Sequence, residues 1–479
     1  MASSIKPVFV LVALAVAIGS ASASGPLRVL AKNPRYFTDD SGKAIYLTGS
    51  HTWDNLVEIT HLDSNPNPVV DFNLYLAFLE SHHHNFFRLW MWESAGEMDA
   101  AGTVKYRYSP LPYARPGPGT ALDGSPKFDL RLFNSDYFDR MGKRVIAARA
   151  RGMYVSIMLF QGFSLNKKSH DDPWPGHPFN AHNNINSIDG DPDHTGGGLA
   201  THSLSIPAIT ALQEAYLKRV IDEVNDLDNV LYEITNEDDG SPQDTAWQFH
   251  MIQFIKSYEA GKPHQHPVGM TVAYPHGSNA DLYNSGADWI SPNEAGGYQT
   301  DPPAADGRKV IVNDTDHSFY YTALQKAGQA AQRAWAWKNL TRGNNTLFMD
   351  PYLDPTPWYM TDRNHPTGNT PDPYWDVLRA AMGDTKLYAD RMNLADMTPQ
   401  NALASTTYCL ANPGTEYLVY RPAAGAFTVD LQAGKYTYEW FDPVNHRVVS
   451  KGSFMARGGS RSFNPPIKSD AVLYLKAAH

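Results

Sequence analysis

Eight short apolar runs recur between about residue 27 and residue 392, and longer stretches with helical periodicity separate most of them. In the longer stretches apolar residues return every three or four positions, as on a helix with one buried face. The short runs predict strands at 44–50, 85–90, 153–159, 229–235, 266–272, 288–292, 309–314 and 346–350, and the periodic stretches predict helices at 69–82, 136–152, 208–225 and 245–260. Strands that alternate with helices in this way predict an α/β fold, the (β/α)8 TIM barrel.

Two places along the chain bear on the choice between this barrel and other folds: the sixth run and the turn after the first run. The sixth run is short, and no clear helical stretch follows it. An open doubly wound sheet would require a glycine-rich turn after the first strand, but the sequence there reads TGSHTWDN. Before the first strand, two β-prone runs flank the turn DDSG at 39–42, which predicts a hairpin that could plug the bottom of the barrel.

Two segments are too long to be simple connections between a strand and a helix. They span 93–133 and 160–206, and both follow the C-terminal ends of predicted strands. Long insertions in a compact domain are usually binding loops or lids. Barrel enzymes place their sites on this same face, so the insertions mark the expected position of a site.

The sequence pattern changes after about residue 392. From there to the end, apolar and polar residues alternate between turns rich in glycine and proline. That alternation predicts strands with one buried face, and the number of short strands predicts a small all-β sandwich. The expected organisation is therefore a barrel at 24–392 and a β-sandwich domain at 393–479.

The N-terminus and the composition narrow the cellular setting. Residues 1–23 hold one lysine, an apolar run too short for a comfortable membrane span, and small residues suited to cleavage, which predicts a signal peptide and a secreted or periplasmic protein. The net charge of −10 argues against a nucleic-acid partner, and no later segment predicts a membrane span. The single cysteine, Cys409, excludes an internal disulfide and a cysteine-based zinc cluster.

Polar residues gather where the predicted strands end. Arg88 lies within an otherwise apolar strand, either as a surface arginine or as one that pairs with a carboxylate at the barrel mouth. The fourth run, NVLYEIT, ends in Asn236 and Glu237, and the seventh ends in Asp314, followed by Asp316 and His317. Strands four and seven lie across a barrel from each other, so these acids can face one cleft.

Paired acids of this kind suit the hydrolysis of a glycosidic bond. One carboxyl group protonates the leaving oxygen, while the other stays ionised to attack or to activate water. The alternative is that Glu237 and the two aspartates after it form a solvated loop that caps a helix. Arg88 and the acids of the seventh strand favour the catalytic interpretation.

These residues resemble the clan A glycoside hydrolases, in which an Asn-Glu pair ends strand four. A closer resemblance is to apiosidase-like bacterial barrel proteins labelled as cellulases, which open with a hairpin like 33–55 and end in a β-domain, labelled collagen-binding, like 434–475. The resemblance covers nearly the whole mature chain. It implies that Glu237 is the acid/base, that Asn236 holds the substrate near the bond cleaved, and that Arg88 steadies the nucleophile.

The nucleophile is the position where the sequence departs from the clan pattern. The clan uses glutamate there, whereas this chain offers Asp314 and Asp316, and alignment with the clan pattern favours Asp316. Strand alternation would place both aspartates on one face, so periodicity does not separate them. The resemblance implies that the reaction retains the configuration of the anomeric carbon. Because aspartate is shorter than glutamate, it would place the two carboxyl groups further apart than in most retaining enzymes, so inversion stays an alternative.

Further residues near the strand ends are candidates for substrate binding. Aromatic rings can stack on sugars or can pack in the core, and His and Asn side chains can bond sugar hydroxyls. The aromatic candidates are Trp53, Trp90, Trp92 and Tyr298, and the polar candidates are His51, Asn55, Asn293 and His317.

The sequence leaves three functions in competition. A secreted glycoside hydrolase that acts on a polysaccharide or oligosaccharide leads. A non-catalytic carbohydrate-binding barrel is the second. A metal-dependent hydrolase built on His51, Glu237, Asp316 and His317 is the third, and it lacks any paired-histidine spacing. No cofactor and no metal are expected, and the oligomeric state is left open.

Overall fold

Eight parallel strands form the central sheet of the protein, which a computed structural model describes at residues 25–62, 70–166, 171–319, 321–353 and 371–478. The proposed signal peptide at 1–23 lies outside the described residues. In sheet order the strands are β3 (Thr48–His51), β15 (Asn345–Met349), β14 (Val310–Asp314), β13 (Trp289–Ser291), β12 (Val268–Thr271), β11 (Val230–Asn236), β10 (Tyr154–Gln161) and β5 (Phe86–Leu89). Each coincides with one of the eight predicted runs, so the TIM barrel is confirmed.

The ring of strands closes between β3 and β5. The backbone N–H of Asn85 donates to the carbonyl of Thr48 at 3.0 Å, and the Asn85 side chain accepts from the N–H of Thr48 at 3.0 Å. Gly49 allows this approach, because a Cβ atom there would stand 1.8 Å from the carbonyl oxygen of Phe86. A glycine at this position therefore lets the first and second barrel strands meet.

The hairpin before the barrel closes its lower end, as the sequence predicts. Strand β1 (Arg28–Val29) pairs antiparallel with β2 (Phe37–Thr38), and Phe37 also bridges Ile45 across the predicted turn. Leu27 and Phe37 pack in one buried cluster with inward residues at the lower ends of the barrel strands. The members of this cluster on the strands are Phe86, Tyr154, Leu231, Trp289, Val310, Val312 and Leu347.

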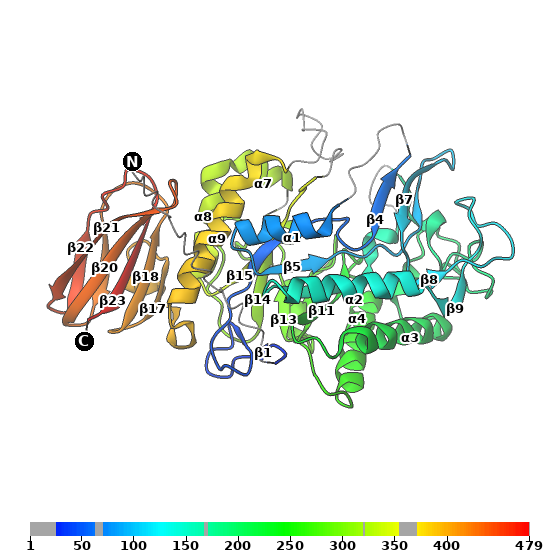
Figure 1. The fold of residues 1–479 in the computed structure, drawn as a ribbon, viewed down its shortest axis with the longest axis horizontal. Helices are drawn as coiled ribbons and strands as arrows, with labels where there is room; N and C mark the ends of the chain where they lie inside the picture. Colours follow the sequence, from blue (N-terminus) through cyan, green and yellow to red (C-terminus); the bar gives the residue numbers. More distant parts are fainter. Residues whose placement is uncertain (1–24, 63–69, 167–170, 320, 354–370, 479) are drawn as a thin grey trace, which may run out of the picture.

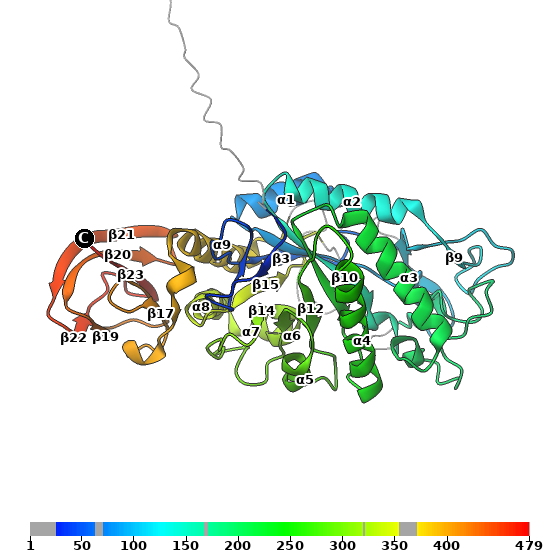
Figure 2. The same cartoon turned by 90° about the horizontal axis from the view of Figure 1, so that it is seen from below.

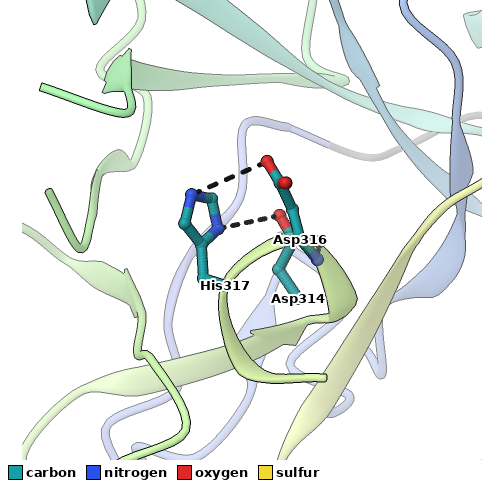
Figure 3. A group of neighbouring side chains, drawn as sticks. All are labelled: Asp314, Asp316 and His317. Atoms are coloured by element: carbon teal, nitrogen blue, oxygen red, sulfur yellow. Dashed lines mark hydrogen bonds and ion pairs between the residues drawn. The ribbon is translucent and has the colours of Figure 1, made fainter. Parts of the chain in front are cut away.

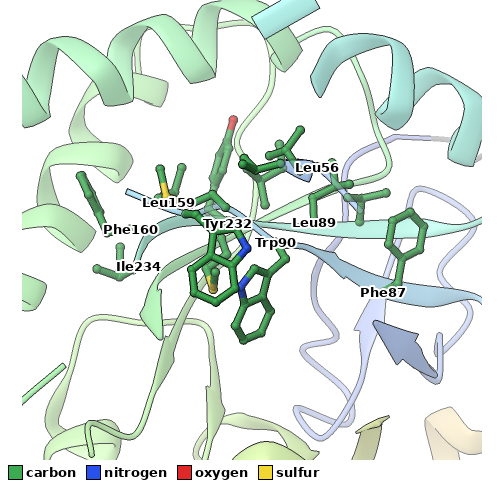
Figure 4. Packing of buried hydrophobic residues seen from close by; sticks show 14 of the residues in the cluster. Leu56, Phe87, Leu89, Trp90, Leu159, Phe160, Tyr232 and Ile234 are labelled. Atoms are coloured by element: carbon green, nitrogen blue, oxygen red, sulfur yellow. The ribbon is translucent and has the colours of Figure 1, made fainter. Parts of the chain in front are cut away.

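Helices cover the outside of the barrel and bury its outer apolar face. Leu89, Leu159 and Ile234 belong to this outer core, part of which Figure 4 shows. Polar side chains cap the N-termini of several helices. The Asp71 side chain, for example, accepts hydrogen bonds from the N–H groups of Asn73 and Leu74 in the first of them. The helices are α1 (Phe72–Ser81), α2 (Ser135–Arg149), α3 (Pro207–Val224), α4 (Pro242–Glu259), α5 (Asn279–Asn284), α6 (Thr315–Ser318), α7 (Tyr321–Ala327), α8 (Gln329–Thr341) and α9 (Asp376–Arg391). Between β13 and β14, residues 292–309 form no helix, which explains why the sequence shows none.

Both long insertions are folded and lie against each other on the C-terminal side of the strands. The first forms β6 (Gly96–Met98), β7 (Val104–Ser109), β8 (Tyr113–Ala114) and β9 (Asp129–Phe133), and β7 also pairs with β4 (Glu58–His61). The second forms the 3-10 helices η1 (Gly162–Ser164), η2 (Trp174–Gly176) and η3 (Leu199–His202). Backbone bonds join the two, such as the N–H of Phe128 to the carbonyl of Asn183 at 2.8 Å.

The C-terminal strands form a separate β-domain at one end of the molecule (Figure 1). Its six-stranded sheet contains β16 (Thr398–Pro399), β17 (Cys409–Asn412), β18 (Glu416–Arg421), β23 (Ala471–Ala477), β20 (Gly434–Asp442) and β21 (Arg447–Ala456), and a second sheet pairs β19 (Phe427–Leu431) with β22 (Gly459–Phe463). A buried cluster that includes Cys409, Val429 and Leu473 fills the space between the sheets.

The other face of the six-stranded sheet packs on α8 and α9, which lie between it and the barrel (Figure 2). Trp337 of α8 and Tyr388 of α9 pack there with Tyr420 and Phe441. Arg333 of α8 adds a bidentate ion pair to Asp470, with both contacts at 2.8 Å. This packing makes the β-domain a brace for the last two barrel helices. None of the described helices has the length and apolar character needed to cross a membrane.

Candidate active site

Arg88 lies at the centre of the upper barrel and is fully buried. Its guanidinium donates two hydrogen bonds of 2.6 Å to Glu233, one of 2.8 Å to Asp314, and one of 3.2 Å to Nε2 of His51. The pKa of His51 is lowered, first by burial and then by Arg88, which agrees with a neutral imidazole that accepts this bond. Arg88 is therefore a buried partner of carboxylates, as predicted, and the surface interpretation is wrong.

Glu233 is the partner that the sequence interpretation missed. It lies in β11 between apolar neighbours, points into the barrel, and also accepts hydrogen bonds from Ser156 and Thr271. The signal was a charged residue within an apolar run, where Glu233 alternates with Leu231 and Thr235 on one face of the strand. A buried arginine needs such a partner, because an unpaired charge in the barrel would be costly.

Asp314 and Asp316 lie on different elements rather than on one strand face. Strand β14 ends at Asp314, whose carboxylate accepts from the N–H of Asp316 at 3.0 Å and so caps α6. Asp316 consequently belongs to the first helical turn, and the expectation from strand alternation is wrong. The physical reason is the capping bond, which turns the chain immediately after Asp314.

His317 faces both aspartates (Figure 3). Its Nδ1 lies 3.5 Å from Asp314, and its Nε2 lies 3.6 Å from Asp316. Both Asp314 oxygens already have hydrogen-bond donors, whereas Oδ2 of Asp316 has none among the described residues. Asp314 is fully buried and Asp316 is 9% exposed, so Asp316 is the more accessible of the two aspartates.

The surroundings of the two aspartates drive their pKa values apart. Burial alone would raise the pKa of Asp314, but Arg88, His317 and His51 lower it well below the ordinary value. Burial also raises the pKa of Asp316, the negative charges of Glu237 and Asp314 add to the rise, and His317 and Arg88 oppose it, with a result of about 7. Asp314 is therefore a fixed anion, and Asp316 exchanges its proton near neutral pH.

Glu237 stands at the upper end of β11, directly after Asn236. It is half-buried, its backbone has a φ of 51°, and no cation among the described residues pairs with it. A left-handed conformation costs a non-glycine residue about 1–3 kcal/mol and is concentrated at functional sites. Burial is the largest cause of the raised pKa of Asp316 and the charge of Glu237 adds to it, so Glu237 lies in the electrostatic surroundings of Asp316 at the barrel mouth.

Several substrate-binding candidates have structural contacts of their own. Asn55 donates to the carbonyl of Arg88 at 2.7 Å and accepts from the N–H of Trp90 at 2.8 Å, so both ends of its amide bind the backbone. Trp92 donates to the carbonyl of Trp53 at 2.9 Å and is 7% exposed. Trp90 is 2% exposed and stacks on the imidazole of His51 at 5.1 Å. These side chains form the buried wall behind the site.

Four candidates remain, and they differ in their contacts. Trp53 is partly exposed and packs against the apolar core. Asn236 is buried, donates to the side-chain oxygen of Gln161 at 3.3 Å, and keeps its own oxygen without a partner among the described residues. Asn293 is half-buried and accepts from the N–H of Ala295, as in a turn. Tyr298 is 3% exposed and lies hydroxyl to hydroxyl with Tyr283, so its ring packs in the core.

A second group of buried ionisable side chains adjoins Glu237, and sequence reasoning missed it. Glu93, at the end of the second barrel strand, contacts His177 and His202, and His202 also contacts Asp238. His177 and His202 come from the second insertion, far from Glu93 in sequence. No periodicity in the insertion pointed to them.

Two hollows lie near the insertions, a smaller one between the two insertions and α3, and a larger one over the first insertion. The smaller one is lined mostly by apolar side chains and by Glu93, and the larger one lies among Tyr108, Arg115 and Asp123. Neither is lined by Glu237 or Asp316. The site is therefore defined by the geometry and electrostatics of its side chains rather than by these hollows.

Comparison with known proteins supports the fold at this point. A family model described as a domain of unknown function, DUF6298, matches residues 98–275, and no curated protein sequence matches the chain. A glycoside hydrolase of family 5 from Bacteroides vulgatus superposes with a TM-score of 0.59 at 14% identity, covering 95% of this chain and 94% of that one. A second structure from Bacteroides vulgatus, described as a putative glycoside hydrolase, gives 0.59 at 13% identity over 96% and 83%.

A third structure, described as a glycoside hydrolase, gives a TM-score of 0.55 at 13% identity over 95% of this chain and 97% of that one. These likenesses extend over nearly the whole lengths of the chains, so they include both the barrel and the β-domain. At such identities they establish a fold shared with glycoside hydrolases. The apiosidase-like and collagen-binding labels stay at the level of sequence resemblance.

Proposed function

We propose that this protein is a glycoside hydrolase that cleaves O-glycosidic bonds with Glu237 and Asp316. The observation that carries the proposal is the placement of these two carboxyl groups just beyond the ends of β11 and β14, the fourth and seventh strands, at the C-terminal face of the barrel. Two carboxyl groups astride the scissile bond are what this chemistry requires. The fold shared with solved glycoside hydrolases supports the same reaction class.

The two carboxyl groups have different surroundings, and these support different roles. Burial and the charges of Glu237 and Asp314 raise the pKa of Asp316, but His317 and Arg88 oppose the rise and favour the ionised form. No cation among the described side chains pairs with Glu237. A nucleophile must be an anion when the bond breaks, whereas an acid must hold its proton until then. We therefore assign the nucleophile to Asp316 and the acid/base to Glu237.

The proposed reaction has two steps and retains configuration. In the first, Glu237 gives its proton to the leaving oxygen while Asp316 attacks the anomeric carbon and forms a glycosyl ester. In the second, Glu237 takes a proton from water, the water attacks the same carbon, and Asp316 leaves as the carboxylate. The position of Asp316 beyond the end of β14, on α6, supports its reach into the site despite its short side chain.

We place the substrate, a carbohydrate, beside Glu237 and Asn236, whose side-chain oxygen has no partner among the described residues, with His51 and Trp90 as the wall behind. Export through the N-terminal segment, to the periplasm or out of the cell, is part of the proposal and fits a polysaccharide or oligosaccharide substrate. The sugar and linkage are found by offering defined oligosaccharides to the wild type and to Glu237→Gln, with NMR of the first-formed anomer. Cleavage by the wild type alone supports the proposal. Binding without turnover by either protein would instead indicate a carbohydrate-binding barrel.

The pH dependence of the reaction follows from the pKa of Asp316, which is raised to about 7. We expect kcat/KM to rise as the pH rises through about 7, because the proposed nucleophile must be ionised to attack. In Glu237→Gln, assayed with a leaving group that needs no protonation, this ascending limb should move to lower pH, since one negative neighbour of Asp316 is gone. An ascending limb at the same pH in the variant would contradict the pairing.

The group of Asp314, Asp316 and His317 also supports a second candidate function, that of a metal-dependent hydrolase. One ligand atom from each lies within 4.8 Å of the others. Against a metal, one oxygen of Asp314 is already held by Arg88 at 2.8 Å, and a second cation would stand close to that guanidinium. Activity that survives exhaustive chelation supports the two-carboxylate reaction. Activity lost with the chelator and restored by one divalent ion would support the metal enzyme.

A further inference from the structure

We propose that His202 is a positioning residue for the acid/base Glu237, acting through Asp238; this inference rests on the proposed function. Nδ1 of His202 donates to Asp238 at 2.5 Å, and its Nε2 is shared between the two oxygens of Glu93 at 3.1 and 3.2 Å. Asp238 is the residue that follows Glu237. His202 therefore joins the end of the second barrel strand to the turn that carries the proposed proton donor.

The charges of the group make His202 a permanent cation. Burial alone would lower the pKa of His202, but Asp238 and Glu93 raise it to about 10. Burial works against the ionised form of Glu93 as well, yet His202 and His177 lower its pKa to about 2. His177 donates its Nε2–H to Glu93 and accepts at Nδ1 from the N–H of Phe179, so it is neutral. His202 is thus the one imidazolium between two carboxylates.

Asp238 is held by His202 at one side-chain oxygen and by two further contacts at its backbone. Its carbonyl accepts from the N–H of Tyr274 at 2.7 Å, and Gly162 packs so closely that a Cβ atom there would stand 2.6 Å from the Cα of Asp238. With Asn236 fixed in β11 and Asp238 fixed by His202, the left-handed turn at Glu237 is set from both ends. Such a conformation persists only when its surroundings hold it.

The position of His202 in the fold links the second insertion to the same turn. It ends η3, and its ring stacks on Trp247 of α4 at 4.2 Å between ring centres and 7° between planes. An imidazolium on an indole face is a favourable contact of a cation with a ring. The second insertion is therefore fastened beside the acid/base. Its contact through His202 holds the turn that carries the carboxyl group of Glu237.

The test compares two leaving groups in the same sugar series. kcat/KM reports bond cleavage, which needs an acid for an alkyl or sugar leaving group and needs none for 2,4-dinitrophenolate. We expect His202→Gln to lower kcat/KM by 10- to 100-fold for the sugar leaving group and by less than 3-fold for dinitrophenolate. Asp238→Asn, which keeps an oxygen for His202 and removes one charge, should show the same selectivity with a smaller loss. Thermal unfolding identifies variants that fold.

His177→Gln is the matched control, because His177 contacts Glu93 without touching Asp238. It should change both substrates by the same factor. Equal losses for both leaving groups in His202→Gln and Asp238→Asn, or no loss, would overturn the positioning role. Glu237→Gln is assayed beside them: if it too lacks any preference for dinitrophenolate, the proposed function itself fails. If it has that preference and the other two variants lack it, only the inference about His202 fails.

Discussion

Replacing Arg88 with methionine should destabilise the folded protein by about 3–5 kcal/mol at neutral pH. Arg88 is fully buried, and its guanidinium is bonded to two carboxylates that are also fully buried, Glu233 and Asp314. Without Arg88, the carboxylates of Glu233 and Asp314 would remain close together in the barrel without the cation that is bonded to both. The measurement is denaturant unfolding of the variant and the wild type under the same buffer.

The control for this prediction is Arg28→Met, because Arg28 forms an ion pair with Asp40 in which both side chains are more than half exposed. That change should cost no more than about 1 kcal/mol, since water screens exposed pairs. Adding Glu233→Gln to the Arg88 variant should recover part of the loss, because it removes one uncompensated charge. If Arg88→Met costs no more than Arg28→Met, the buried charge cluster does not have the role given to it here.

Glu237→Gln should lower kcat/KM for a sugar leaving group by about 10²- to 10⁴-fold, the range in which a positioned general acid contributes. The amide keeps the size of the side chain but has no proton to give. Asp316→Asn should lose at least as much with every leaving group, because it removes the atom that forms the covalent bond. Steady-state kinetics with the glycoside found in the screen measures both.

Asp314→Asn serves as the matched control for Asp316→Asn, since the two residues stand two positions apart. Asp314 is fully buried and has hydrogen-bond donors at both oxygens, so its removal should cost mainly stability. We expect about 3 kcal/mol, from leaving part of the charge on Arg88 unpaired. If Asp314→Asn lost more activity than Asp316→Asn while it stayed folded, the assignment of the nucleophile would move to Asp314.

The strands of the barrel could be predicted from the sequence for a physical reason. Both faces of a parallel strand are buried, one against helices and one inside the barrel, so each strand is a nearly continuous apolar run. Within such a run a charged residue is conspicuous, and that is how Arg88 was found. Glu233 lies in the run 229–235 and is conspicuous for the same reason, although the interpretation of this strand relied on the polar residues at its end.

The placement of polar side chains was harder to predict, because residue type does not show where a hydrogen bond goes. The sequence predicts that Asn55 bonds a sugar hydroxyl. In the structure, however, both the nitrogen and the oxygen of its amide form hydrogen bonds with the backbone of the second barrel strand. Strand alternation places Asp316 on the face of Asp314. In the structure the N–H of Asp316 donates to the Asp314 side chain, and the helix that includes Asp316 begins at Thr315. These outcomes depend on the neighbours that folding supplies rather than on local spacing.

The contacts of His202 lie beyond sequence reasoning altogether. The insertion that carries it has no regular period, and its partner Glu93 is 109 residues away along the chain. Only the meeting of the two insertions above the barrel brings these side chains together. Long insertions could thus be recognised as functional from their length and position, while the residues within them that matter could not.

Azide rescue tests the division of roles between Glu237 and Asp316 most directly. In Asp316→Ala the space of the missing carboxylate admits azide, which attacks the anomeric carbon once and inverts it. In Glu237→Ala, with an activated leaving group, Asp316 still forms the glycosyl ester, and azide then attacks a second time and restores the configuration. The product of each variant is read by proton NMR of its glycosyl azide.

The account predicts an azide of inverted configuration from Asp316→Ala and of retained configuration from Glu237→Ala. The raised pKa of Asp316, about 7, would by itself also suit a proton donor, which makes the measurement decisive. The reverse pattern, with inversion from Glu237→Ala and retention from Asp316→Ala, would contradict the assignment and exchange the two roles.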